Sequence, residues 1–99
     1  MKKIATLIAA LTLQPNPWIT PEVKAPGLSY GTFESAAAKT KVSYHILLPE
    51  AHAQQPNATF PVLYWLHGSG GGLPGIPSLA QHFREAIAAE KTPPFIVVF

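Results

Sequence analysis

Two uninterrupted apolar runs, separated by a segment with helical periodicity, constrain the fold of this chain more than any other feature. Residues 60–66 read FPVLYWL and residues 95–99 read FIVVF. Continuous runs rich in β-branched and aromatic residues are typical of strands buried on both faces of a sheet. Between them, residues 78–90 carry apolar side chains at helical spacing. The order predicts a strand, a helix and a second strand parallel to the first.

The ends of the helix can also be read from the sequence. Ser78 with Gln81 three residues later has the spacing of a capping box, which predicts Ser78 as the N-cap. Lys91 follows the helix, and Pro93 and Pro94 forbid its continuation.

An antiparallel pair of strands is expected before this unit, over residues 28–34 and 41–48. In the second segment apolar and polar positions alternate, which is the pattern of a half-buried strand. His45 lies at a polar position of this pattern, so we expect it to be solvated. Residues 49–59 are polar and are expected to form a loop. Since nothing follows residues 95–99 to cover them, we expect the sequence to be a fragment or a truncated reading frame.

The N-terminal residues 1–14, MKKIATLIAALTLQ, have the form of a signal peptide: a basic start followed by an apolar run too short to span a bilayer. Export to the periplasm or the medium is the preferred interpretation, although no A-x-A cleavage site follows. An uncleaved tail or a buried helix is the alternative. Residues 15–26 contain four prolines and are expected to be an extended linker. The folded domain is expected over residues 27–99.

Composition excludes several classes of site. The chain has no Cys and no Asp, so disulfides, thiolate catalysis and an Asp-containing triad are impossible. Seven Lys and Arg stand against five acidic residues, and no basic patch indicates nucleic acid. The four histidines lack the spacing of metal ligands, so we expect no metal and no cofactor; they are His45, His52, His67 and His82.

A five-residue match to a nucleophile motif occurs at residues 27–31, GLSYG, which fits G-x-S-x-G. That motif requires a buried strand before the serine and a helix after it. Ser29 instead follows the proline-rich segment and precedes a strand-like TFES. We therefore expect Ser29 to lie in or just before a strand and not to be a nucleophile.

The second glycine-rich stretch, LHGSGGG at residues 66–72, directly follows a predicted buried strand. Glycines there allow positive φ and close approach of the backbone to a ligand. Successive N–H groups in such a turn can stabilise a negatively charged oxygen, as in an oxyanion hole. A flexible surface connection is the alternative. His67 is expected to support the loop by hydrogen bonding.

These segments, YHILLPE, FPVLYWLHGSGGG and PPFIVVF, together resemble the N-terminal third of α/β-hydrolase-fold esterases. The subgroup contains feruloyl esterases, S-formylglutathione hydrolases and polyhydroxybutyrate-depolymerase-like enzymes. The resemblance implies an α/β fold with an incomplete α/β-hydrolase sheet, made of an antiparallel strand pair and one βαβ unit over residues 27–99. It implies an oxyanion hole at Gly68, Ser69 and Gly70, with the N–H of Ser69 or Gly70 as donor and His67 supporting the loop.

In this family the catalytic serine, acid and histidine follow later in the chain, so the triad would lie beyond Phe99. The chain alone is then expected to be inactive, and the full-length protein to act on a small-molecule or polymer ester. Two alternatives stay open. One is a small secreted binding module or a truncated remnant without function. The other is a phosphate-binding loop, because residues 70–75, GGGLPG, match G-x-G-x-x-G, although Pro74 and Pro77 interrupt the helix start.

Overall fold

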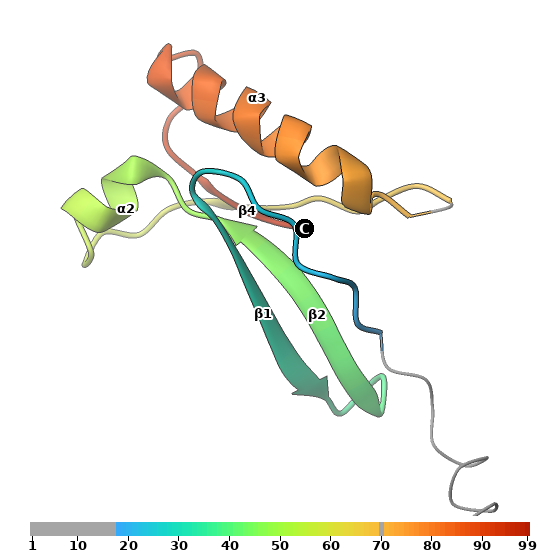
Figure 1. Cartoon of the computed structure of the whole chain (residues 1–99). Helices are drawn as coiled ribbons and strands as arrows, with labels where there is room; N and C mark the ends of the chain where they lie inside the picture. The colour runs from blue at the N-terminus through green and yellow to red at the C-terminus, as the bar shows by residue number, and fades with distance from the viewer. Residues whose placement is uncertain (1–17, 70) are drawn as a thin grey trace, which may run out of the picture.

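The computed structural model describes residues 18–69 and 71–99. The candidate signal peptide, the first residues of the predicted linker and Gly70 therefore lie outside the described residues. The described part is a small α/β structure (Figure 1). Its elements are β1 (Leu28–Ser35), β2 (Thr40–Leu47), α2 (Glu50–Gln54), β3 (Val62–Tyr64), the 3₁₀ turn η1 (Leu73–Gly75), α3 (Ile76–Ala88) and β4 (Ile96–Val98).

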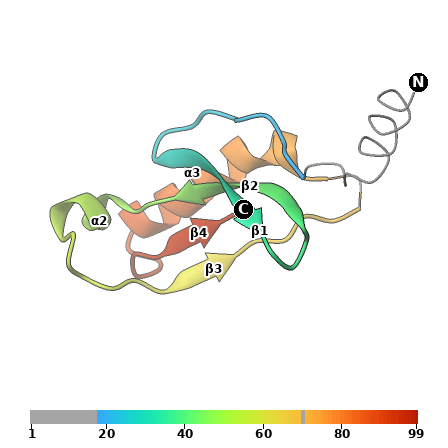
Figure 2. The same ribbon diagram turned by 90° about the horizontal axis from the view of Figure 1, so that it is seen from below.

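The four strands form one mixed sheet in the order β1-β2-β4-β3. β1 and β2 are antiparallel over their whole length, and β3 and β4 are parallel, as the sequence predicts. The two halves are joined because β4 pairs antiparallel with the end of β2, at Ile46 and Leu47. Figure 1 shows the β1–β2 hairpin extending away from the other elements, and Figure 2 shows β3 at the edge opposite β1.

A small core lies where α3 crosses β2 and β4. Leu47, Ala80 and Val97 are the fully buried members of this cluster. Aromatic rings extend it: Phe83 meets Phe95 edge-on at 5.6 Å between ring centroids. Edge-on ring pairs of this kind stabilise the fold by about 0.5–1.5 kcal/mol beyond the contribution from burying their apolar area. Because one helix supplies one side of this core, the remaining face of the sheet is only partly covered.

The buried face of β2 is the one that alternation did not predict. Val42 and Tyr44, at the apolar positions of the pattern, are only half-buried, whereas His45 is 2% and Leu47 1% exposed. The prediction that His45 is solvated is therefore wrong. The physical reason is that α3 packs on the Leu47 side of β2, and residues 18–26 cover the same face at His45.

β3 is shorter and more exposed than its apolar sequence predicts. Val62, Leu63 and Tyr64 are all exposed, Tyr64 to 70%, and Leu66 beyond the strand is 86% exposed. β3 lies at the edge of the sheet and pairs with β4 alone. The prediction of burial on both faces is wrong for this strand because no described element lies beyond its free edge.

The helix starts before the predicted N-cap. α3 begins at Ile76 with Gly75 as its N-cap, and no side chain accepts a hydrogen bond there. Ser78 is thus inside the first turn, where it cannot cap. The preceding η1 turn leads directly into the helix, and Pro77 is tolerated in the first turn because the N–H groups there have no partner within the helix.

The C-terminus of α3 closes with the hydrogen bonds of a Schellman motif. The N–H of Lys91 donates to Ala86 O and that of Glu90 to Ile87 O, both at 3.0 Å. Glu90 has φ +58°, a position that usually holds glycine. The helix therefore ends through its own backbone before Pro93 is reached.

The short helix α2 was not predicted, because residues 49–59 read as a loop. Pro49 is extended and precedes one helical turn, EAHAQ, closed by the N–H of Gln55 donating to Ala51 O at 2.8 Å. Glu50 in the first turn complements the helix dipole. No helix among the described residues is long and apolar enough to cross a membrane.

Candidate functional site

The glycine-rich loop leaves β3 at the carboxyl ends of the two parallel strands. Trp65 continues the pairing by donating its N–H to Val98 O at 2.8 Å, after which the backbone turns away. The N–H of Gly71 donates to Gly68 O at 3.3 Å and so closes the turn, with Gly71 at φ +83°. Ligands of open α/β sheets commonly bind in this position, beyond the carboxyl ends of parallel strands.

His67 contacts the turn directly. Its Nδ1–H donates to Gly68 O at 2.6 Å, so Gly68 O accepts from both His67 and Gly71. The ring is exposed at the surface. This contact is the geometry that a supporting role for His67 requires.

The structure describes two of the three residues expected in the oxyanion hole, Gly68 and Ser69. Gly68 and Ser69 are exposed, and a Cβ added to Gly68 would meet nothing within 4 Å. Within the described residues no hydrogen bond engages the N–H of Ser69. Gly70 lies outside the described residues. Ser69 therefore offers a backbone donor on an open surface, next to a turn whose own N–H at Gly71 is already used.

Gly72 is the glycine at which side-chain space is the constraint. A Cβ there would lie 2.6 Å from Trp65 Cη2 and 2.7 Å from His67 Cβ. Since real Cβ atoms do not approach other atoms so closely, only glycine fits between these residues without a shift. Gly72 thereby fixes the return of the loop across the indole of Trp65.

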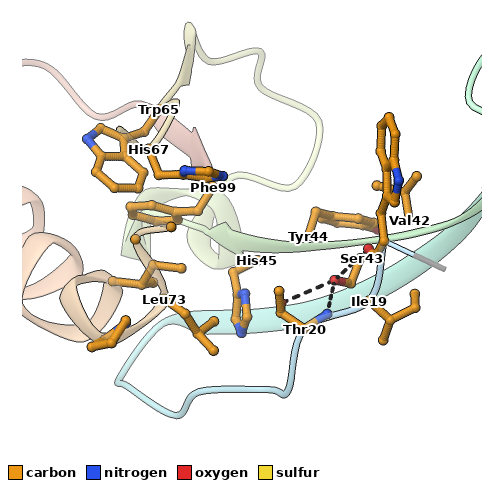
Figure 3. Close-up of a pocket in the computed structure, with 15 residues that line it drawn as sticks. Ile19, Thr20, Val42, Ser43, Tyr44, His45, Trp65, His67, Leu73 and Phe99 are labelled. Atoms are coloured by element: carbon orange, nitrogen blue, oxygen red, sulfur yellow. Dashed lines mark hydrogen bonds between the residues drawn. The ribbon is translucent and has the colours of Figure 1, made fainter. Parts of the chain in front are cut away.

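A cavity of about 600 Å³ opens beside the loop. Figure 3 shows Trp65, His67 and Phe99 at one end, Thr20 and Ser43 at the other, and His45 between them. Its size is that of a small-molecule site, and such sites are apolar with a few polar groups. Its lining is mostly apolar: Trp18, Ile19, Thr20, Val42, Ser43, Tyr44, His45, Trp65, His67, Gly71, Gly72, Leu73, Pro74, Ile76 and Phe99.

Residues 18–26, here called the strap, border this cavity through their first three residues, Trp18, Ile19 and Thr20. The strap pairs with β2 at its start, where Trp18 N–H donates to Lys41 O and Ser43 N–H to Trp18 O. Side chains continue the attachment: Thr20 N–H donates to Ser43 Oγ at 2.9 Å, and Tyr30 OH to Thr20 O at 2.8 Å. The strap is thus held on the sheet largely by side chains of β1 and β2.

His45 makes the next attachment along the strap. Its Nε2 accepts the N–H of Val23 at 2.9 Å, so the ring is neutral with its proton on Nδ1. Tyr30 meets the ring edge-on at 5.0 Å. Burial lowers the pKa of His45 below its ordinary value of 6.5, an effect that the Glu22 carboxylate partly opposes.

Ser29 does not have the strand-turn-helix surroundings that a nucleophile elbow needs. It is in β1, paired with Ile46, with a turn at Gly27 before it and more strand after it. Ser29 does not line the cavity. His82 is exposed on α3 as expected. In residues 18–69 and 71–99 no group of three potential metal ligands comes together.

Comparison with known proteins adds one finding on the fold. No family model matches the chain, and no curated protein matches it. A solved structure titled ferulic acid esterase matches with a TM-score of 0.62 and 23% sequence identity, over 72% of this chain. The likeness is one of fold. The chain spans 29% of the length of that esterase.

Proposed function

We propose that these 99 residues form the N-terminal part of a serine carboxylic-ester hydrolase and contribute its oxyanion-hole loop. In this proposal the backbone N–H of Ser69 or Gly70 donates to the oxyanion of the tetrahedral intermediate. The nucleophilic serine, its acid and its histidine come from residues outside this sequence. The substrate is a small-molecule or polymer ester.

The observation that carries the proposal is the position of the loop. Residues 66–72 leave β3 at the carboxyl ends of the parallel strands, beside an apolar cavity of about 600 Å³. Backbone donors placed there act on a reacting group bound in the cavity without reorganising, which is how oxyanion holes lower barriers. This role needs an available backbone donor, and among the described residues nothing accepts a hydrogen bond from the Ser69 N–H.

The fold supports the same conclusion. The sheet order β1-β2-β4-β3, with two antiparallel pairings and one parallel pairing, belongs to a structure similar to part of a ferulic acid esterase. The exposed apolar edge of β3 is suited to a further parallel strand, which would bring another polypeptide segment next to the glycine-rich loop. A nucleophile carried on that segment would face the Ser69 N–H across the mouth of the cavity.

The phosphate-binding alternative fits the structure less well. Such a site needs free backbone N–H groups where the helix opens on the phosphate. Here Pro74 lies in η1 and Pro77 in the first turn of α3, and each removes one N–H from that surface.

Two measurements test the proposal. The coding sequence downstream of Phe99 is expected to continue in frame with a strand, a G-x-S-x-G turn, a helix, and later an acid and a histidine. The 99-residue chain itself is expected to hydrolyse p-nitrophenyl acetate no faster than buffer, because it has no triad. A stop codon after Phe99 together with a stable, folded chain would support the binding module. Turnover by the chain that Ser29→Ala abolishes would contradict both the assignment of the loop and our reading of Ser29.

A further inference from the structure

The strap, whose first three residues line the cavity, is attached to the sheet through contacts of two chemical kinds. At its start, the attachments are backbone pairs and hydrogen bonds that involve the hydroxyl groups of Ser43 and Tyr30. At Val23 the attachment is to an imidazole. After it, Gly27 O accepts the N–H of Leu48 at 3.2 Å and fixes the other end. The middle of the strap, residues 21–24, therefore depends on His45.

We propose that His45 is a pH-dependent attachment point, and that its protonation releases the middle of the strap from the sheet. The geometry points to this role because Nε2 acts as an acceptor in the attached state. A proton on Nε2 turns the acceptor into a donor, which then faces the N–H donor of Val23. The bond is replaced by a contact between two donors.

Burial makes the protonated, attached state still less favourable. His45 is 2% exposed, and a charged imidazole in that position lacks water. The strap is the cover that can leave, because the other neighbours of the ring belong to the sheet or to the core. Release of residues 21–24 gives the imidazolium access to solvent while both ends of the strap stay attached.

The other ionisable groups near His45 do not replace this mechanism. Glu22 on the strap favours the charged ring, but Lys24 already pairs with its carboxylate at 3.0 Å. Tyr30 on β1 meets the ring edge-on, and His67 stands across the cavity in contact with Gly68 O. From α3 and from the end of the chain after β4, the cavity is lined by Ile76 and Phe99, both apolar.

The direction of the pH dependence follows from these facts. Because the attached state lowers the pKa of His45, the attachment is complete above the ordinary value of 6.5 and is lost as pH falls through the lowered value. One proton is involved, so the ratio of attached to released strap falls by at most tenfold per pH unit. This inference does not rest on the ester hydrolase proposal, because it depends only on the contact between the strap and His45.

The test is amide exchange by NMR on the 99-residue chain between pH 8 and 5, expressed as protection factors to remove the intrinsic pH dependence of exchange. The protection of the Val23 amide is expected to fall below pH 6.5, by up to tenfold per unit, with the same midpoint as the ¹⁵N shift of His45 Nε2. The Leu48 amide, bonded to Gly27 O, is expected to keep its protection.

Two variants separate His45 from other titrating groups. In His45→Gln, the side-chain oxygen can accept the Val23 N–H but does not titrate, so the Val23 protection is expected to be flat with pH. In His82→Gln, an exposed position on α3, the wild-type fall is expected to persist. A flat wild-type profile, a pH-dependent fall that survives in His45→Gln, or an equal fall at Leu48 would each overturn the proposal. Should His45→Gln not fold, the agreement of the two wild-type midpoints remains the decisive result.

Discussion

Gly72→Ala is the substitution for which the structure gives the sharpest expectation. The added Cβ would lie 2.6 Å from Trp65 Cη2, 2.9 Å from Trp65 Cζ3 and 2.7 Å from His67 Cβ. The indole could swing aside only by giving up its contact with Phe99, 5.8 Å away between ring centroids. His67 Cβ is fixed to the backbone and cannot rotate away. We expect a loss of about 1–3 kcal/mol in the free energy of unfolding, the usual cost of overpacking.

Urea unfolding followed by tryptophan fluorescence measures this loss. With a slope of about 1 kcal/mol per molar urea, the low end for small proteins, the midpoint is expected to fall by about 1–3 M. Gly75→Ala is the matched control, because a Cβ there meets nothing within 4 Å and φ is −85°. That variant is expected to be unchanged or up to about 1 kcal/mol more stable, since alanine narrows the unfolded ensemble. Equal midpoints for Gly72→Ala and wild type would refute the packing argument.

Three further predictions follow from single positions. Glu90→Gly is expected to raise the free energy of unfolding by about 0.5–1 kcal/mol in the same urea experiment, because Glu90 has φ +58° at the end of α3; a lower midpoint would contradict this. Leu47→Ala, in the centre of the small core, is expected to lower the free energy of unfolding by about 2–5 kcal/mol. Leu66→Ala, at an 86% exposed position, is expected to lower it little. Thermal melting compares the two variants, and similar losses would argue against the core as described. The free energy of unfolding of the wild type is expected to be constant above about pH 6.5 and to fall below it, because on acidification the unfolded chain binds a proton at His45 before the folded one does. A His45→Gln variant that loses the same stability at low pH would show that another group is responsible.

The elements that the sequence predicts well are those whose patterns are local. Residues 95–99 are apolar throughout, and the structure places β4 there with Val97 fully buried. The antiparallel pairing of β1 with β2 and the existence of α3 follow equally from nearby residues. The start of α3 was misplaced because a backbone turn, η1, replaces the side-chain cap that Ser78 suggested.

Features that depend on contacts between residues far apart in the sequence could not be predicted from local patterns. The packing of α3 and of residues 18–26 decides which face of β2 is covered, and alternation within β2 carries no information on that packing. His45 was consequently assigned to the solvated face. The four prolines of residues 15–26 predicted an extended segment, but the partners that hold the strap, Ser43 and His45, are more than 20 residues away. The glycine-rich loop could be found from its sequence alone, because glycine content and a preceding strand are local signals.

The turnover of an ester by the chain extended through its downstream reading frame tests the central claim most directly. Ser69→Pro removes a backbone N–H, and Ser69→Ala keeps it. With Ser69 as the donor, kcat is expected to fall by about 10²–10³ in Ser69→Pro and to stay near wild type in Ser69→Ala, while Gly70→Pro shows the same loss if Gly70 is the donor. Wild-type turnover in both proline variants would contradict the assignment of the oxyanion hole to this loop.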